Sequence, residues 1–176
     1  LKLSRHDAVT LASIVEREVR RRDEGPVVAA VYLNRLRSRM MLQADPTVTY
    51  ALGKRPGRVT YKDLRVSSAY NTYRVFGLPP GPIGSPGMSS LEATLHPAKV
   101  PYKFFVAHPD GHHEFRKTYR EHLEAIRMVR AIAGSDSATR ELNAVRAARD
   151  SAARAAGAPI ESLPPLVAPP KKPRRP

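Results

Sequence analysis

The chain has 176 residues, a length that suits one domain with a substantial core and shorter appendages. Its 30 Lys and Arg against 16 Asp and Glu give a net charge of +14, which favours anionic partners, although a GC-rich genome that uses Arg freely gives the same balance. The lack of cysteine excludes disulfides and thiolate metal sites, and no apolar run approaches the ~18 residues of a membrane helix. Because the chain begins at Leu1 rather than Met, we expect it to be a fragment or a processed piece.

The first predicted helix, over 7–22, carries an acid on its apolar face. Four positions share that face at the helical spacing i, i+3, i+4 and i+7: Leu11, Ile14, Val15 and Glu18. A carboxyl held against apolar surface resists ionising, and this is how a Glu becomes a general acid near neutral pH. Glu16, two positions earlier, is expected to point toward water.

Glu18 also has a simpler interpretation. A Glu at the edge of an apolar stripe is commonly solvated or salt-bridged. Arg21 and Arg22 follow at i+3 and i+4, where they can pair with it. Periodicity alone leaves both interpretations open.

Capping residues and prolines mark the ends of the predicted helices. The expected signals are Asp7 as N-cap of the first helix, Pro26 starting a second helix to about 39, Asp45 capping a third before Pro46 and Gly53 closing it, and capping boxes at Thr60–Asp63, Ser89–Glu92 and Thr118–Glu121. The helix after Ser89 should end before Pro97, and the one after Thr118 should close near Gly134.

A small β-hairpin is predicted over 102–116. Residues 102–107 are rich in aromatic and β-branched types, a Pro-Asp-Gly turn follows at 109–111, and 113–116 can return as the partner strand. The fold class is therefore α+β, mainly α. Between the helices, residues 70–88 hold too many Pro and Gly residues for a helix, and form either a wall for a polar ligand or a structural loop.

Glycan cleavage fits these residues better than other chemistries. His108, His112 and His113 cluster near a predicted turn rather than on the helix that an i, i+4 zinc site uses, and no phosphate-binding loop or nucleophile elbow appears. Glycosidic cleavage needs a proton donor, which Glu18 can supply, and hydrolases add a second carboxylate about 5–10 Å away. Asp45 is the best candidate for that second acid, but its place before Pro46 explains it as a helix cap. One unpartnered acid suits a lytic mechanism in which the sugar's own 6-hydroxyl replaces water.

Five blocks of the sequence, in order and at matching spacing over about residues 8–130, resemble the endolytic murein transglycosylase (MltG/YceG-like) family. They read LASIVEREV, VAAVYLNRL, LQADPTVTYALG, AYNTYRVFGLPPGPIGSPG and SLEATLHPAKVPYKFFVA. The resemblance implies a lysozyme-like lytic transglycosylase domain. Such an enzyme cleaves nascent peptidoglycan glycan strands between N-acetylmuramic acid and N-acetylglucosamine, leaving 1,6-anhydro-N-acetylmuramic acid ends, and needs no cofactor or metal.

The resemblance also assigns residues and a location. The family's catalytic Glu falls on Glu18, and the next position holds Val19 where related lytic enzymes often have a small hydroxyl residue. The implied groove residues are Gln43, Asp45, Thr47, Tyr70, Asn71, Thr72 and Tyr73. Family members carry an N-terminal membrane helix and a LysM-like module that this sequence lacks. The implied setting is cell-wall assembly at the bacterial inner membrane, with the domain on its outer face and peptidoglycan synthases as candidate partners.

Three segments are expected: a catalytic domain over 1–134, an Ala/Arg-rich helix over 135–156, and a disordered, Pro-rich basic tail over 157–176. The tail either binds acidic lipids or polymers or is inert. Two other functions stay open: a noncatalytic peptidoglycan-binding module and, on charge alone, a nucleic-acid binder. The scarcity of aromatics among the basic runs argues against nucleic acid, so we expect no nucleic-acid partner.

Overall fold

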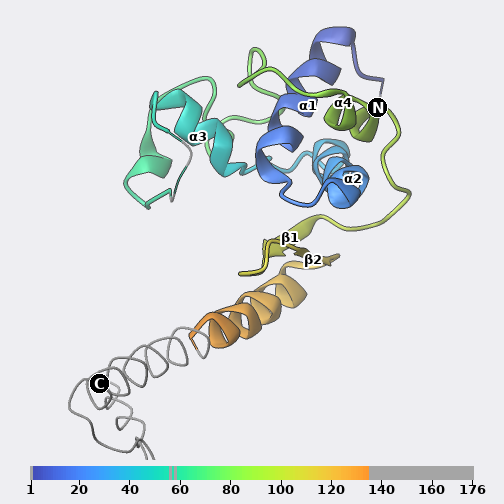
Figure 1. Ribbon diagram of the computed structural model, residues 1–176. Helices are drawn as coiled ribbons and strands as arrows, with labels where there is room; N and C mark the ends of the chain where they lie inside the picture. Colours follow the sequence, from blue (N-terminus) through green and yellow to red (C-terminus); the bar gives the residue numbers. More distant parts are fainter. Residues whose placement is uncertain (1, 56, 58, 135–176) are drawn as a thin grey trace, which may run out of the picture. The chain divides into compact units, whose positions relative to one another are not determined.

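The structure is a computed structural model that describes residues 2–55, 57 and 59–134 (Figure 1). The chain forms two compact units, Leu1–Ile126 and Arg127–Pro176. The elements that follow, as far as β2, belong to the first unit. The expected helix over 135–156 and tail over 157–176 lie outside the described residues.

Helix α1 covers Arg5–Glu18 and begins with a capping box. Ser4 is the N-cap: its hydroxyl accepts from the Asp7 amide, while the Asp7 carboxylate accepts from the Ser4 amide. The prediction of Asp7 as N-cap is therefore wrong by three positions. The helix ends four residues earlier than expected, because Val19 has extended backbone dihedrals.

Helices α1, α2 and α4 pack together in the first unit (Figure 1). Helix α2 covers Gly25–Arg37, and the short helix α4 covers Met88–Leu95. The N-cap of α4 is Gly87, which has no side chain to cap it, so the capping box predicted at Ser89–Glu92 is wrong. Its end at Leu95, before Pro97, agrees with expectation. The buried core residues are Leu11, Ile14, Val15, Val28, Ala29, Tyr32, Leu33, Leu42, Ala44 and Ile83.

Two 3₁₀ turns and helix α3 also belong to the helical part. The turn η1 is Arg22–Glu24, helix α3 is Asp45–Ala51, and η2 is Asp63–Arg65. Thr60 and Asp63 exchange the predicted capping-box hydrogen bonds at the start of η2. Gly53, just past α3, has a φ of +61°, which supports its predicted role in ending that helix.

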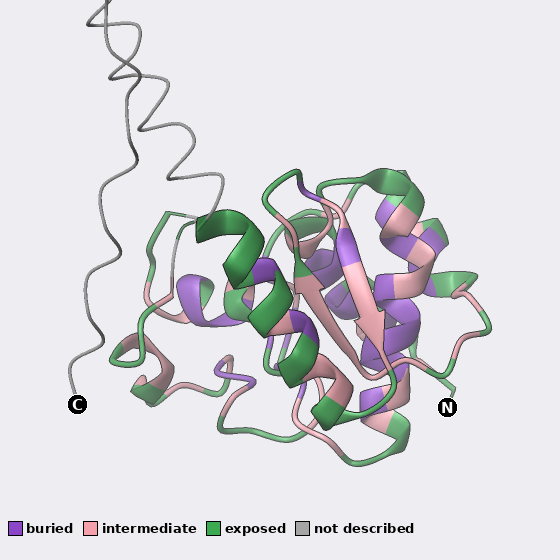
Figure 2. Ribbon diagram, turned by 90° about the horizontal axis from the view of Figure 1, so that it is seen from below, coloured by how far each residue is buried: buried purple, intermediate pink, exposed green. Residues whose placement is uncertain are grey.

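The predicted hairpin is present. Strands β1, Phe104–Ala107, and β2, His113–Arg116, pair antiparallel, with Phe105 opposite Phe115. Figure 2 shows both strands as mainly half-buried. Thr118 and Glu121 form the predicted capping box, and a helix runs from 119 to the last described residue, 134.

The structure therefore confirms the α+β, mainly α fold class. No helix in the described part of the chain combines the length and apolarity needed to cross a bilayer.

Candidate active site

Glu18 lies at the end of the apolar face of α1. Leu11, Ile14 and Val15 on that face are fully buried, and Glu18, the last residue of the helix, is itself partly buried. The hydroxyl of Tyr32 on α2 donates a 2.8 Å hydrogen bond to Oε1 of Glu18. The predicted helical face is thus present, with the acid turned toward protein rather than open solvent.

Burial raises the pKa of Glu18 to about 7. The hydrogen bond from Tyr32 opposes this rise, the negative charge of Asp45 adds to it, and the positive charge of Arg35 lowers the pKa. Glu18 therefore titrates near neutral pH, whereas an ordinary Glu is ionised there. An acid tuned in this way can donate a proton and then take one back.

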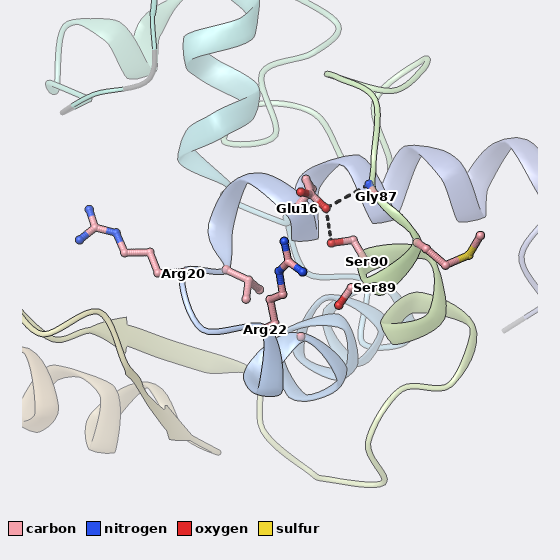
Figure 3. Close-up of a pocket in the computed structure, with 9 residues that line it drawn as sticks. Glu16, Arg20, Arg22, Gly87, Ser89 and Ser90 are labelled. Atoms are coloured by element: carbon pink, nitrogen blue, oxygen red, sulfur yellow. Dashed lines mark hydrogen bonds between the residues drawn. The ribbon is translucent and has the colours of Figure 1, made fainter.

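Glu16 has the opposite environment. It is exposed, and its Oε2 accepts from the Gly87 amide at 3.1 Å and the Ser90 hydroxyl at 2.6 Å (Figure 3). These hydrogen bonds lower the pKa of Glu16 and place its charge at the N-terminus of α4. Glu16 therefore joins α1 to α4 and is ionised at neutral pH.

The pocket drawn in Figure 3 lies on this Glu16 side of α1. Its volume is about 410 Å³, and it is lined by Glu16, Val19, Arg20, Arg22, Gly25, Gly87, Met88, Ser89 and Ser90. Glu18 does not line it. The salt-bridge alternative for Glu18 is also contradicted, since Arg21 and Arg22 are exposed and Glu18 forms no ion pair with any residue in the described ranges.

Asp45 acts on Glu18 through its negative charge, and it does not cap α3. The N-cap is Ala44, with Asp45 already inside the helix, so the predicted capping role is wrong. The Asp45 carboxylate instead accepts from the Tyr73 hydroxyl at 2.5 Å. Burial and this hydrogen bond raise the pKa of Tyr73, so its hydroxyl stays protonated.

Three of the expected groove residues have buried side chains with internal partners. Asn71 donates from Nδ2 to the carbonyls of Leu64 and Val66. The Thr72 hydroxyl accepts from the Ala44 amide at 3.0 Å and pairs with the Thr47 hydroxyl at 2.9 Å. These contacts fix the segment around 71–73 against the start of α3.

Gln43 and Tyr70 are more accessible. Gln43 is exposed and has a φ of 51°, a left-handed backbone conformation that is uncommon for a non-glycine residue. Its backbone amide donates to the Thr72 backbone carbonyl. Tyr70 is half-buried, and its ring lies 4.8 Å from that of Tyr50. Local strain of the kind at Gln43 is often found at functional sites.

Sequence reasoning missed Tyr32 and Arg35. Both lie on α2, and Arg35 is only 8% exposed. Its Nε donates to the Lys103 carbonyl and its Nη1 to the Leu42 carbonyl, each at 2.6 Å. One face of this helix carries Val28, Val31, Tyr32 and Arg35. An Arg on an otherwise apolar face is the sequence signal that could have identified Arg35 and its neighbour Tyr32.

Comparison with known proteins identifies the family of this chain. The chain belongs to the YceG-like family, whose model matches residues 1–128. An endolytic murein transglycosylase of Bacillus subtilis is 49% identical over 124 residues, which cover 70% of this chain and 34% of that protein. One from Streptococcus pneumoniae is 33% identical over 110 residues, covering 60% of this chain and 20% of that protein. The chain thus spans about a third of the length of the first relative and a fifth of the second.

A solved structure agrees with the family assignment. The crystal structure of a yceG-like protein from Listeria monocytogenes matches with a TM-score of 0.68 at 47% identity, covering 70% of this chain and 40% of that one.

Proposed function

We propose that this chain is the catalytic part of an endolytic peptidoglycan lytic transglycosylase, with Glu18 as its acid and base. The observation that carries the proposal is a partly buried Glu18 whose pKa is near 7 and whose neighbours are Tyr32, Asp45 and Arg35. The names of the Bacillus and Streptococcus relatives support murein as the substrate.

In the proposed reaction, protonated Glu18 donates its proton to the oxygen that links N-acetylmuramic acid to N-acetylglucosamine. The bond from that oxygen to the anomeric carbon breaks, and an oxocarbenium-like state forms. The Glu18 carboxylate then takes the proton of the muramic 6-hydroxyl, whose oxygen bonds to the anomeric carbon. No water is consumed, and Glu18 ends protonated as it began.

Holding the nucleophile within the substrate gives a proximity advantage. The negative charge of Asp45 supports the mechanism twice: it favours the protonated form of Glu18, and it stabilises positive charge that develops on the sugar ring.

The expected groove residues have two roles in this proposal. Gln43, Asp45, Tyr70 and Tyr73 keep exposed or half-buried surface, so we assign them to glycan contact. Thr47, Asn71 and Thr72 are buried, so we assign them to holding that wall in place. The family resemblance adds four further parts to the proposal. They are a lysozyme-like fold, action outside the cytoplasmic membrane, attachment to the membrane and contact with synthases.

Product analysis tests the function. Purified peptidoglycan is incubated with the chain and with Glu18→Gln, and the released glycans are analysed by mass spectrometry. We expect 1,6-anhydro ends from the wild type and none from Glu18→Gln, whose circular dichroism spectrum should match that of the wild type. Glu16→Gln is the matched control and should retain product formation, because Glu16 only joins α1 to α4.

The other outcomes point to other functions. Ordinary reducing ends in place of anhydro ends would mean hydrolysis. Binding of glycan strands without any cleavage would favour the noncatalytic module.

A further inference from the structure

The two carboxylate oxygens of Glu18 have different surroundings, and the difference comes from α2. Oε1 accepts the hydroxyl hydrogen of Tyr32 at 2.8 Å. A protonated carboxyl keeps one carbonyl-like oxygen that only accepts, and one oxygen that carries the proton. The donor on Oε1 favours the tautomer with the proton on Oε2.

The Tyr32 hydroxyl is held rigidly. The residue is 1% exposed and belongs to the hydrophobic core. Its ring packs perpendicular to that of Phe105 of β1, at a centroid distance of 5.9 Å and an interplanar angle of 89°. The middle of α2 and the hairpin thus fix the position of one oxygen atom.

Tyr32 donates in this contact whenever Glu18 is ionised. Burial, and then the charge and hydrogen bond of Glu18, raise the pKa of Tyr32 well above its usual value. The hydroxyl therefore keeps its proton at every pH at which Glu18 titrates. It cannot compete with Glu18 as a base.

We propose that Tyr32 is a positioning residue that occupies Oε1 of Glu18 and so assigns both proton transfers of the reaction to Oε2. This inference rests on the proposed function. Tyr32 itself gains and loses no proton during turnover.

The first test is the variant Tyr32→Phe in the whole 176-residue chain, with the carboxyl of Glu18 titrated by carbon-13 NMR without any glycan. Because a donor to the carboxylate stabilises its ionised form, removing it should raise the midpoint of the Glu18 titration by about one pH unit. The alkaline limb of the pH–rate profile should move by the same amount, and kcat should fall roughly tenfold at little cost in KM. Tyr61→Phe is the control, because Tyr61 is 88% exposed.

A second variant keeps the proposal falsifiable if Tyr32→Phe does not fold. A monofluorinated tyrosine placed only at position 32 keeps the ring and the hydroxyl but is a stronger donor, so the Glu18 midpoint should move in the opposite direction, to lower pH. A midpoint that stays within 0.2 units (roughly 0.3 kcal/mol) of the wild type in the folded variants would overturn the inference. Failure of the wild type to form anhydro ends would instead overturn the proposed function, and the two failures are distinguishable because the titration uses no substrate.

Discussion

Tyr73 donates its hydroxyl hydrogen to Oδ1 of Asp45 over 2.5 Å, and this pair joins the segment around 71–73 to the first turn of α3. The pair carries one negative charge, and that charge raises the pKa of Glu18. The proton affinity of the acid on α1 is therefore set in part by a contact between two other segments.

Asp45→Asn should lower the pKa of Glu18, because the neutral amide removes a nearby negative charge while its oxygen can still accept from Tyr73. The alkaline limb of the pH–rate profile, near pH 7 in the wild type, should move to lower pH. Asp23→Asn is the control, since Asp23 is exposed and lies in η1. An unchanged limb in Asp45→Asn would contradict the electrostatic role of Asp45.

Glu18→Gln should stabilise the protein in a pH-dependent way. The folded pKa of Glu18 is about 7 against a usual value of 4.5, so its ionisation favours the unfolded chain. The part of the wild-type stability that depends on protonated Glu18 is fully present below pH 4.5 and is lost as the pH rises through 7. At pH 8 the variant should exceed the wild type by roughly 2–3 kcal/mol in free energy of unfolding, and at pH 4 the two should be alike.

Urea denaturation at several pH values measures this difference. Comparing the two proteins at each pH cancels the titration of the other groups that they share. A gap that stays constant with pH would mean that Glu18 is solvated in the folded state.

How much of this site the sequence could reveal depends on how local each signal is. The apolar face that presents Glu18 is a pattern within one helix, and the hairpin follows from a single turn, so both could be predicted. The partner of Glu18 is 14 residues away on another helix, which no periodicity within α1 can reveal. The role of Asp45 was misjudged because an Asp before Pro46 has the composition of a helix start, and its actual partner is 28 residues away.

Buried and exposed polar residues were also indistinguishable from sequence. Asn71 and Tyr73 are two positions apart in an irregular segment, where no helical or strand period tells which side chain faces the interior. The structure separates them, since Asn71 is fully buried and Tyr73 is not.

Arg35→Lys should destabilise the fold while leaving the pH profile in place. A lysine ammonium lacks the planar fork that reaches the carbonyls of Lys103 and Leu42 together. We expect a loss of about 1–3 kcal/mol in thermal or urea denaturation. Because Lys keeps the positive charge that lowers the pKa of Glu18, the alkaline limb should stay near pH 7. The exposed Arg37 gives the matched control, Arg37→Lys, which should change stability little.

Thr72→Val separates a structural role from direct glycan contact. Valine keeps the shape of the side chain but leaves the buried Ala44 amide without its acceptor. The expected loss is about 1–3 kcal/mol of stability, with KM for glycan strands close to that of the wild type. A raised KM at unchanged stability would instead assign Thr72 to the sugar.

Helix α1 ends at Glu18, where the last carbonyls of the helix leave partial negative charge. A carboxylate is the least suitable ion for that end, and a lysine there would suit the helix better. Any effort to stabilise this protein by improving its helix ends would thus select against the acid itself. At position 18, thermal robustness and proton transfer make opposite demands on the sequence.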